Sequence, residues 1–122
     1  MQRAIIVLLS TLALGGGAGA AALAGSIPIG PLPAGPSSTI EVQHGELVAL
    51  ALPHRDSGRV WRVARRYDAN VVQQVSEADV ASSVVLVFRT GSPGLTTVSL
   101  ALTKGDTSAK ALEARRFQIR VR

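Results

Sequence analysis

The sequence contains no cysteine and few aromatic residues. Its 122 residues include one Trp, one Tyr and two Phe. Without cysteine the chain can form no disulfide, no thiolate metal site and no cysteine nucleophile. A hydrophobic core must then be packed mostly from Val, Leu and Ile, and the β-branched members of this set favour strands. The length is that of one domain rather than two.

The basic residues are not arranged as in nucleic-acid-binding proteins. Thirteen Lys and Arg oppose eight Asp and Glu, a formal net charge of +5. No Lys/Arg run is longer than two residues, and the aromatic side chains that stack on bases are nearly absent. We therefore expect no nucleic-acid partner. The excess charge favours solubility and some attraction to anionic surfaces.

Residues 1–24 have the pattern of a signal peptide. Arg3 precedes the apolar run Ala4–Leu14, and Ala22-Leu23-Ala24 is an Ala-x-Ala cleavage site. The alternative is an uncleaved anchor, but a spanning helix needs about 20 apolar residues. Residues 4–24 reach that length only by including four glycines, which oppose helix formation. We expect a periplasmic or secreted protein, with membrane contact only through this segment if it is kept.

Residues 25–38 form a Pro/Gly-rich linker or arm. They hold four of the six prolines, so they can sustain neither a helix nor a central strand. An extended or polyproline-II conformation is expected. Two interpretations remain open: a disordered spacer, or an arm that docks on a partner through Ile27, Ile29 and Leu32.

From residue 39 onward, short apolar runs alternate with turn residues. In the last run, Phe117, Ile119 and Val121 alternate with polar residues, as in a half-buried strand. Strands are expected at 39–42, 46–52, 59–66, 71–76, 84–89, 95–103 and 115–122. Seven strands with a turn at about every ten residues predict an all-β, immunoglobulin-like antiparallel sandwich over residues 39–122. Its main loops would be 53–58, 77–83 and 104–114, the last with helical character over 109–114.

Four stretches carry a resemblance to a known family. They are Ile40-x-Val42-x-x-Gly45-x-x-Val48-x-Leu50-x-Leu52-Pro53, Gly58-Arg59-Val60-Trp61, the segment from Phe88 through Gly94 to Leu100, and Phe117-x-Ile119-x-Val121. Their order resembles the chagasin-like inhibitors of papain-type cysteine proteases, which are immunoglobulin-like sandwiches. The resemblance spans residues 39–122.

The loops depart from the pattern of that family. Its Asn-Pro-Thr-Thr-Gly loop, which enters the protease cleft, corresponds here to residues 54–58, where only Gly58 is retained. Residues 77–83 contain no Gly where the family loop is Gly-rich, and 104–114 contain neither Pro nor Trp. Function is carried by loops rather than by the fold itself.

The resemblance implies a non-catalytic, exported binding module that acts through loops 53–58, 77–83 and 104–114, with a papain-type cysteine protease as partner. The alternative is a structural or assembly subunit of a bacterial envelope complex, which would grip its partners through the Pro-rich arm and a basic face. Loop substitutions should abolish binding in the first case, and deletion of residues 25–38 in the second.

The candidate protein-binding residues surround the first of these loops. They are His54, Arg55, Asp56, Ser57, Gly58, Arg59, Trp61 and Arg62. The only Trp, Trp61, is either a core residue of the third strand or an exposed recognition residue. Arginines next to it in the sequence could stack on its ring. Arg55, Arg59, Arg62, Arg65 and Arg66 form either a solvated basic face or a contact patch for an acidic partner.

No catalytic or metal-binding pattern is present. His54, Asp56 and Ser57 are loop neighbours, whereas a triad needs a base oriented by a third group beside an oxyanion site. Two His with scattered acids are too few for a zinc site. We therefore expect no enzymatic activity, no cofactor and no metal.

Overall fold

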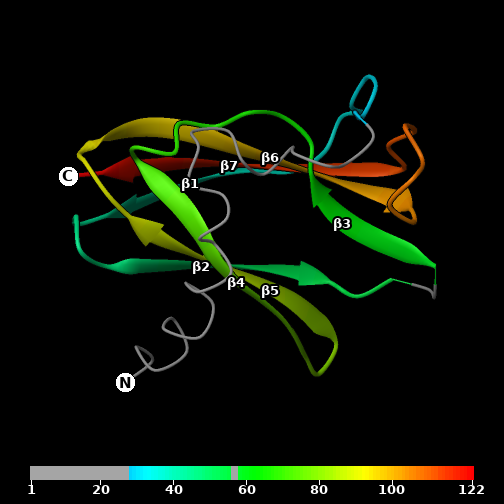
Figure 1. Ribbon diagram of the computed structural model, residues 1–122, viewed down its shortest axis with the longest axis horizontal. Helices are drawn as coiled ribbons and strands as arrows, with labels where there is room; N and C mark the ends of the chain where they lie inside the picture. Colours follow the sequence, from blue (N-terminus) through cyan, green and yellow to red (C-terminus); the bar gives the residue numbers. More distant parts are fainter. Residues whose placement is uncertain (1–27, 56–57) are drawn as a thin grey trace.

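The protein is a sandwich of two β-sheets in a computed structural model that describes residues 28–55 and 58–122 (Figure 1). The seven strands are β1 (Ser37–Val42), β2 (Leu47–Pro53), β3 (Arg59–Val63), β4 (Val72–Val80), β5 (Ser83–Thr90), β6 (Gly94–Lys104) and β7 (Glu113–Val121). Each expected strand is present, and the all-β, immunoglobulin-like fold is confirmed. The described residues include no helix that could cross a membrane. The expected signal segment, 1–24, lies outside the described residues.

Two sheets pack face to face around an aliphatic core. One has the strand order β1-β7-β6-β3 and the other β2-β5-β4. Alternation along the strands turns Leu50, Leu86 and Ile119 inward, where all are almost fully buried. Phe88 lies among them and meets the ring of Tyr67 edge to face, with centroids 5.8 Å apart. The two sheets are thus held together by side-chain packing, since a chain without cysteine has no disulfide to join them.

One strand pair departs from the expected antiparallel pattern. β1 pairs with β7 in parallel, from Ser37 beside Arg116 to Val42 beside Val121, and the other four pairs are antiparallel. The cause is the path of the arm. Residues 28–36 approach the sheet at the end where β7 begins, and the Arg116 amide donates to Pro36 O at 3.0 Å. Entering from that end, β1 must run in the same direction as β7.

Two of the expected loop boundaries were wrong. β4 does not end at residue 76 but continues to Val80, and β5 starts at Ser83, so the expected loop 77–83 is the end of a hairpin. Ala81 makes the turn with φ of 54°. Likewise, the loop before β7 covers 105–112 and is not helical at 109–114: the Leu112 amide donates to Leu102 O, and β7 begins at Glu113.

Residues 28–36 of the Pro-rich arm lie on the outer face of the β1-β7-β6-β3 sheet, and Ile27 is outside the described residues. Ile29 is buried against Ala64 and Ala101, and the half-buried Leu32 and Ala111 complete this second apolar cluster. Neither interpretation of the arm anticipated this. A spacer would leave Ile29 in solvent, and a partner-binding arm would leave it for the partner. The arm instead covers the protein's own sheet.

Candidate functional site

Three connections meet at one end of the sandwich: the β2–β3 loop (54–58), the β4–β5 turn (81–82) and the β6–β7 loop (105–112). The strand registers require this, because Pro53 lies opposite Ser83, Arg59 opposite Lys104, and Leu102 opposite Glu113. In Figure 1 the three connections lie toward the right. We call this the loop end. It contains the expected binding loops in their corrected bounds.

His54 ties the β2–β3 loop to the β4–β5 hairpin. Its backbone amide donates to Ser82 O at 2.9 Å. Its Nε2 lies 3.2 Å from Asp79 Oδ1, with both side chains largely exposed. An exposed pair of this kind contributes little to stability, but it does restrict the orientation of the two side chains. The imidazole partner is therefore Asp79 from β4.

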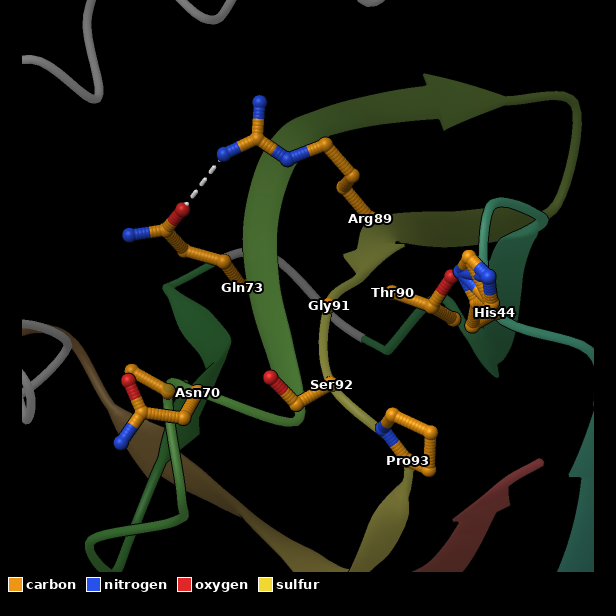
Figure 2. A pocket seen from close by; sticks show the side chains of 9 residues that line it. His44, Asn70, Gln73, Arg89, Thr90, Gly91, Ser92 and Pro93 are labelled. Carbon is orange, nitrogen blue, oxygen red and sulfur yellow. Dashed lines mark hydrogen bonds between the residues drawn. The ribbon is translucent and has the colours of Figure 1, made fainter.

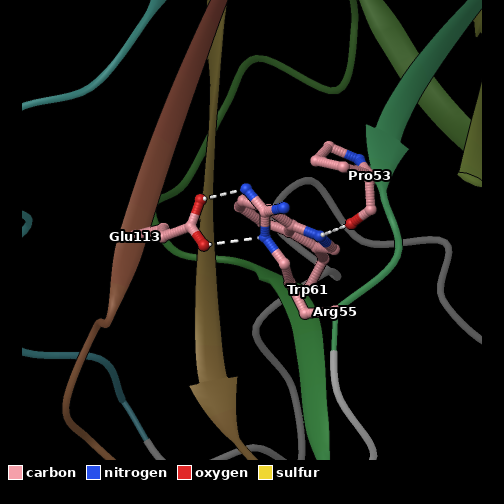
Figure 3. A network of polar contacts seen from close by, with 4 residues as sticks. All are labelled: Pro53, Arg55, Trp61 and Glu113. Carbon is pink, nitrogen blue, oxygen red and sulfur yellow. Dashed lines mark hydrogen bonds and ion pairs between the residues drawn. The ribbon is translucent and has the colours of Figure 1, made fainter.

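Arg55 ties the same loop to the start of β7 (Figure 3). Its Nε donates to Glu113 Oε2 at 2.8 Å and its Nη2 to Oε1 at 2.9 Å, a two-point contact. Hydrogen bonding from Arg55 is the main cause that lowers the pKa of Glu113 below its ordinary 4.5, and the charges of Arg55, Arg115 and Arg59 act in the same direction. The carboxyl of Glu113 is thus held in its charged form beside the loop.

Trp61 lies beneath the loop and belongs to the core. It is 7% exposed, and its indole Nε1 donates to Pro53 O at 2.9 Å (Figure 3). The guanidinium that stacks on its ring, 5.8 Å from the centroid, belongs to Arg115 on β7 rather than to an arginine next to it in the sequence. Trp61 therefore supports the end of β2, where the loop begins, and is not an exposed recognition residue.

The other candidate residues differ in exposure. Gly58 has φ of +86° and is exposed, as is Arg59. Arg62 is half-buried and donates to Ser108 O at 2.8 Å, so its guanidinium reaches the β6–β7 loop. Asp56 and Ser57 lie outside the described residues. The loop end thus brings His54, Arg55, Gly58 and Arg59 to the surface.

The arginine cluster does not form a single basic face. Arg55 binds Glu113, and Arg62 binds Ser108 O. Arg65 donates to the carbonyls of Ile29, Gly30 and Ala64. The alternative of an assembly subunit, which needs both this face and a free arm, is not supported.

A crevice of 270 Å³ opens between the edge strands β3 and β4, next to the loop end. Glu77 and Asp106 line it together with Trp61. Burial, and then the charges of Asp79 and Asp106, raise the pKa of Glu77 above 4.5. Across residues 28–55 and 58–122, no group of three or more His, Cys, Asp or Glu is placed to hold a metal ion.

The opposite end of the sandwich has a polar hollow of 540 Å³ (Figure 2). Several of its polar groups are engaged in hydrogen bonds, with one another or with the adjoining β1–β2 turn. Arg89 donates to Gln73 Oε1 at 2.7 Å, the Ser92 amide donates to Asn70 O, and Thr90 Oγ1 accepts from the Gly45 amide. These contacts hold the turns of that end together. We therefore do not treat this hollow as a second candidate site.

Sequence reasoning missed Asp79, Glu113 and Arg115. The expected loop 77–83 includes Asp79, but β4 continues past it to Val80. Glu113 falls at the end of the expected loop 104–114, and Arg115 at the start of the last expected strand. The available signal was the antiparallel order itself. It places the end of β4 and the start of β7 at the same end as residues 54–58, so charges there were candidates to meet Arg55 and His54.

Comparison with known proteins shows the fold. No family model matches the chain, and no curated protein matches its sequence. Two solved structures are similar. EhICP2, a cysteine protease inhibitor from Entamoeba histolytica, has a TM-score of 0.56 and 14% identity, covering 71% of this chain and 97% of its own. PbICP-C in complex with falcipain-2 has a TM-score of 0.54 and 9% identity, covering 80% and 98%. This chain is therefore an immunoglobulin-like sandwich of the same fold as these proteins.

Proposed function

We propose that this chain is a non-catalytic binding module that binds a papain-type cysteine protease through its loop end. His54, Arg55, Gly58 and Arg59 would supply the surface of contact, with Asp56 and Ser57 in the same loop. Trp61 and Arg62 would support that loop and the β6–β7 loop from beneath. The two similar structures, an inhibitor and a complex with falcipain-2, support this choice of partner.

The observation that carries the proposal is the cross-linking of the loop end. Arg55 joins the β2–β3 loop to β7, and His54 joins it to the β4–β5 hairpin. Contacts from two different sheets therefore restrain His54 and Arg55, the first two residues of this loop. Side chains ordered before binding lose less conformational entropy when they meet a partner, which favours affinity. At the opposite end the exposed β1–β2 turn also contacts both sheets, through the His44 amide to Arg122 O and the Gly45 amide to Thr90 Oγ1. The loop end differs in that ionisable side chains, His54 and Arg55, make the contacts.

The proposal includes a location outside the cytoplasm. The sequence pattern of residues 1–24, with its Ala-x-Ala site, supports export to the periplasm or the medium. Fractionation of cells that express the full chain, with sizing of the product by mass spectrometry, tests both export and cleavage after Ala24. Full-length chain in the cytoplasm would contradict it.

Two glycines provide a matched test of the binding surface. Gly58 at the loop end has φ of +86° and Gly45 at the opposite end +94°, and a Cβ at either would meet no atom within 4 Å. Gly58→Val and Gly45→Val therefore impose the same kind of backbone strain at opposite ends. We expect the full chain to inhibit papain, and Gly58→Val to weaken inhibition by about tenfold or more through loss of the loop conformation.

Gly45→Val is the control and should inhibit as the unchanged chain does, at an equal loss of stability. Thermal unfolding of both variants checks that equality. Equal weakening of inhibition in both would show that lost stability, and not the loop end, is responsible. Fully active papain at saturating concentrations of the chain, with no complex on gel filtration, would overturn the proposal.

A further inference from the structure

We propose that residues 28–33 of the arm act as a strap, locked by Arg65, that positions the β6–β7 loop at the loop end. The role of that loop in binding rests on the proposed function, whereas the strap itself does not. The strap would make the arm a fourth contributor to the binding end, because it holds the β6–β7 loop, which is far from it in the sequence.

Arg65 is the lock. Its Nη2 donates to Gly30 O at 2.8 Å, and its Nη1 donates to Ile29 O at 3.0 Å and to Ala64 O at 2.8 Å. The guanidinium of the half-buried Arg65 thus binds two successive carbonyls of the arm and the carbonyl of Ala64, the residue before it. Hydrogen bonds from a charged donor are stronger than those between neutral groups. Arg65 therefore holds the arm at the point where Ile29 enters its apolar site.

The strap then reaches the loop directly. The Gly30 amide donates to Ala109 O at 2.8 Å, which links the arm to the middle of the β6–β7 loop. Leu32 and Ala111 pack against the cluster of Ile29 and Ala101, so apolar contact accompanies this hydrogen bond. Next to these contacts, arm and loop border a hollow of 590 Å³ lined mainly by apolar and proline residues.

The remaining anchors of the loop lie at its two ends and at Ser108, next to Ala109. The Gly105 amide donates to Thr103 O, and the Leu112 amide donates to Leu102 O. Arg62 donates to Ser108 O from β3. Of the backbone hydrogen bonds to this loop among the described residues, only the one from Gly30 comes from outside β6 and the loop itself. The arm therefore holds Ala109 through its backbone carbonyl, beside the contact that Arg62 makes with Ser108.

The rest of the arm has little freedom to move away. At Gly35 a Cβ would overlap Ala114 O, so the arm lies directly against the start of β7. The Arg116 amide then donates to Pro36 O, and β1 follows. Prolines at 28, 31, 33 and 36 restrict the backbone between these contacts. A stiff segment fixed at both ends transmits its position to the loop that it contacts.

Amide hydrogen exchange in the full chain tests the strap. Arg65→Met removes the three donated hydrogen bonds and keeps the apolar stem, and Arg66→Met is the control at the exposed neighbouring arginine. We expect Arg65→Met to speed exchange at the Gly30 amide and across residues 105–112 by about tenfold. Exchange in β2 and β5 should stay unchanged, and Arg66→Met should change neither.

Gly30→Pro provides a second variant, because it removes the amide that donates to Ala109 O and places the proline ring against that oxygen, while the Arg65 side chain is kept. It should speed exchange in the loop without freeing Ile29. Unchanged exchange at 105–112 in both variants would overturn the strap, and so would an equal increase throughout both sheets, which would indicate general destabilisation.

Papain inhibition separates the strap from the proposed function. If both hold, Arg65→Met should weaken inhibition several-fold, and Arg65→Lys, which keeps the charge, should restore part of it. If the unchanged chain does not inhibit papain, the proposed function fails and the exchange result still decides the strap. If Arg65→Met speeds loop exchange but leaves inhibition unaltered, the arm positions a loop that does not bind.

Discussion

The outer faces of the two sheets differ, although each sheet has an inner strand with a largely apolar stretch, β6 in one and β5 in the other. In β6, every residue from Val98 to Thr103 is buried, so both faces of the strand are covered. In β5, Val84, Leu86 and Phe88 are buried, but Val85 and Val87 on the outer face are only half-buried. Their neighbours on that face, Ala49, Ala51 and Ala78, are exposed.

The arm accounts for this difference at Ala101, in the middle of the β6 face. Ile29 covers Ala101 on the outer face of β6, whereas none of the described residues covers the outer face of β5 in the same way. A continuous apolar run indicates a strand that could be covered on both sides. Whether it is covered depends on a segment elsewhere in the chain. The comparison shows that residues 28–36 act as part of the domain rather than as a tether to it.

The largest expected loss of stability is in the core that both sheets share. It gives a scale for the effects of substitutions on the two outer faces. Trp61→Ala should lower the free energy of unfolding by about 3–5 kcal/mol, because it removes a large buried side chain and leaves a cavity. Val87→Ala on the open outer face should cost about 1 kcal/mol or less. Chemical denaturation of both variants measures this, and similar midpoints would show that the outer face of β5 is covered after all.

A pair of charged substitutions compares the covered and open faces directly. Ala101 is 0% exposed beneath Ile29, and Ala49 is exposed on the opposite outer face. Ala101→Asp should cost about 3 kcal/mol, because the carboxylate is either buried or displaces the arm. Ala49→Asp should cost about 1 kcal/mol or less, chiefly through lower strand propensity.

Denaturation midpoints give the two costs, and proteolysis of the native protein shows whether residues 28–36 become accessible in Ala101→Asp. Equal costs for the two variants would contradict the view that only the β6 face is covered.

The smallest effects concern one carboxyl from each sheet. The pKa of Glu113 on β7 is lowered, so it stabilises the fold at pH 7 and loses that contribution as the pH falls from 4.5 through its folded pKa. Glu113→Gln should therefore cost about 0.2–1 kcal/mol at pH 7, as expected for a largely solvated ion pair, and nothing at lower pH.

Glu77 on β4 should behave in the opposite way. Its pKa is raised, so its stabilising contribution is present below pH 4.5 and is lost as the pH rises through the folded pKa. Glu77→Gln should thus stabilise the protein at pH 7 and make no difference in acid. Thermal unfolding between pH 3 and 7 compares the two variants, and changes of the same sign at pH 7 would contradict the opposite environments of these carboxyls.

Local patterns were sufficient to predict the strands. Alternation in Phe117, Ile119 and Val121, and turn residues at regular spacing, predict all seven strands and the sandwich, because burial on one face imposes a period of two. For Trp61 the sequence left both a core and an exposed position open, and its burial is seen only in the structure. The candidate loop 54–58 followed from the position of the turns and from family resemblance, and its role in binding stays a prediction.

The sequence by itself therefore determined the elements and their order, since each strand carries its own apolar face. Only the tertiary structure decided which side chains meet across the loop end. Arg55 and Glu113 are 58 positions apart, and Arg65 and Gly30 are 35 apart. Pairings at such separations depend on strand register and on the path of the arm, and neither leaves a periodic signal in the residues that it joins. The parallel pairing of β1 with β7 and the burial of the outer face of β6 also depend on the path of the arm.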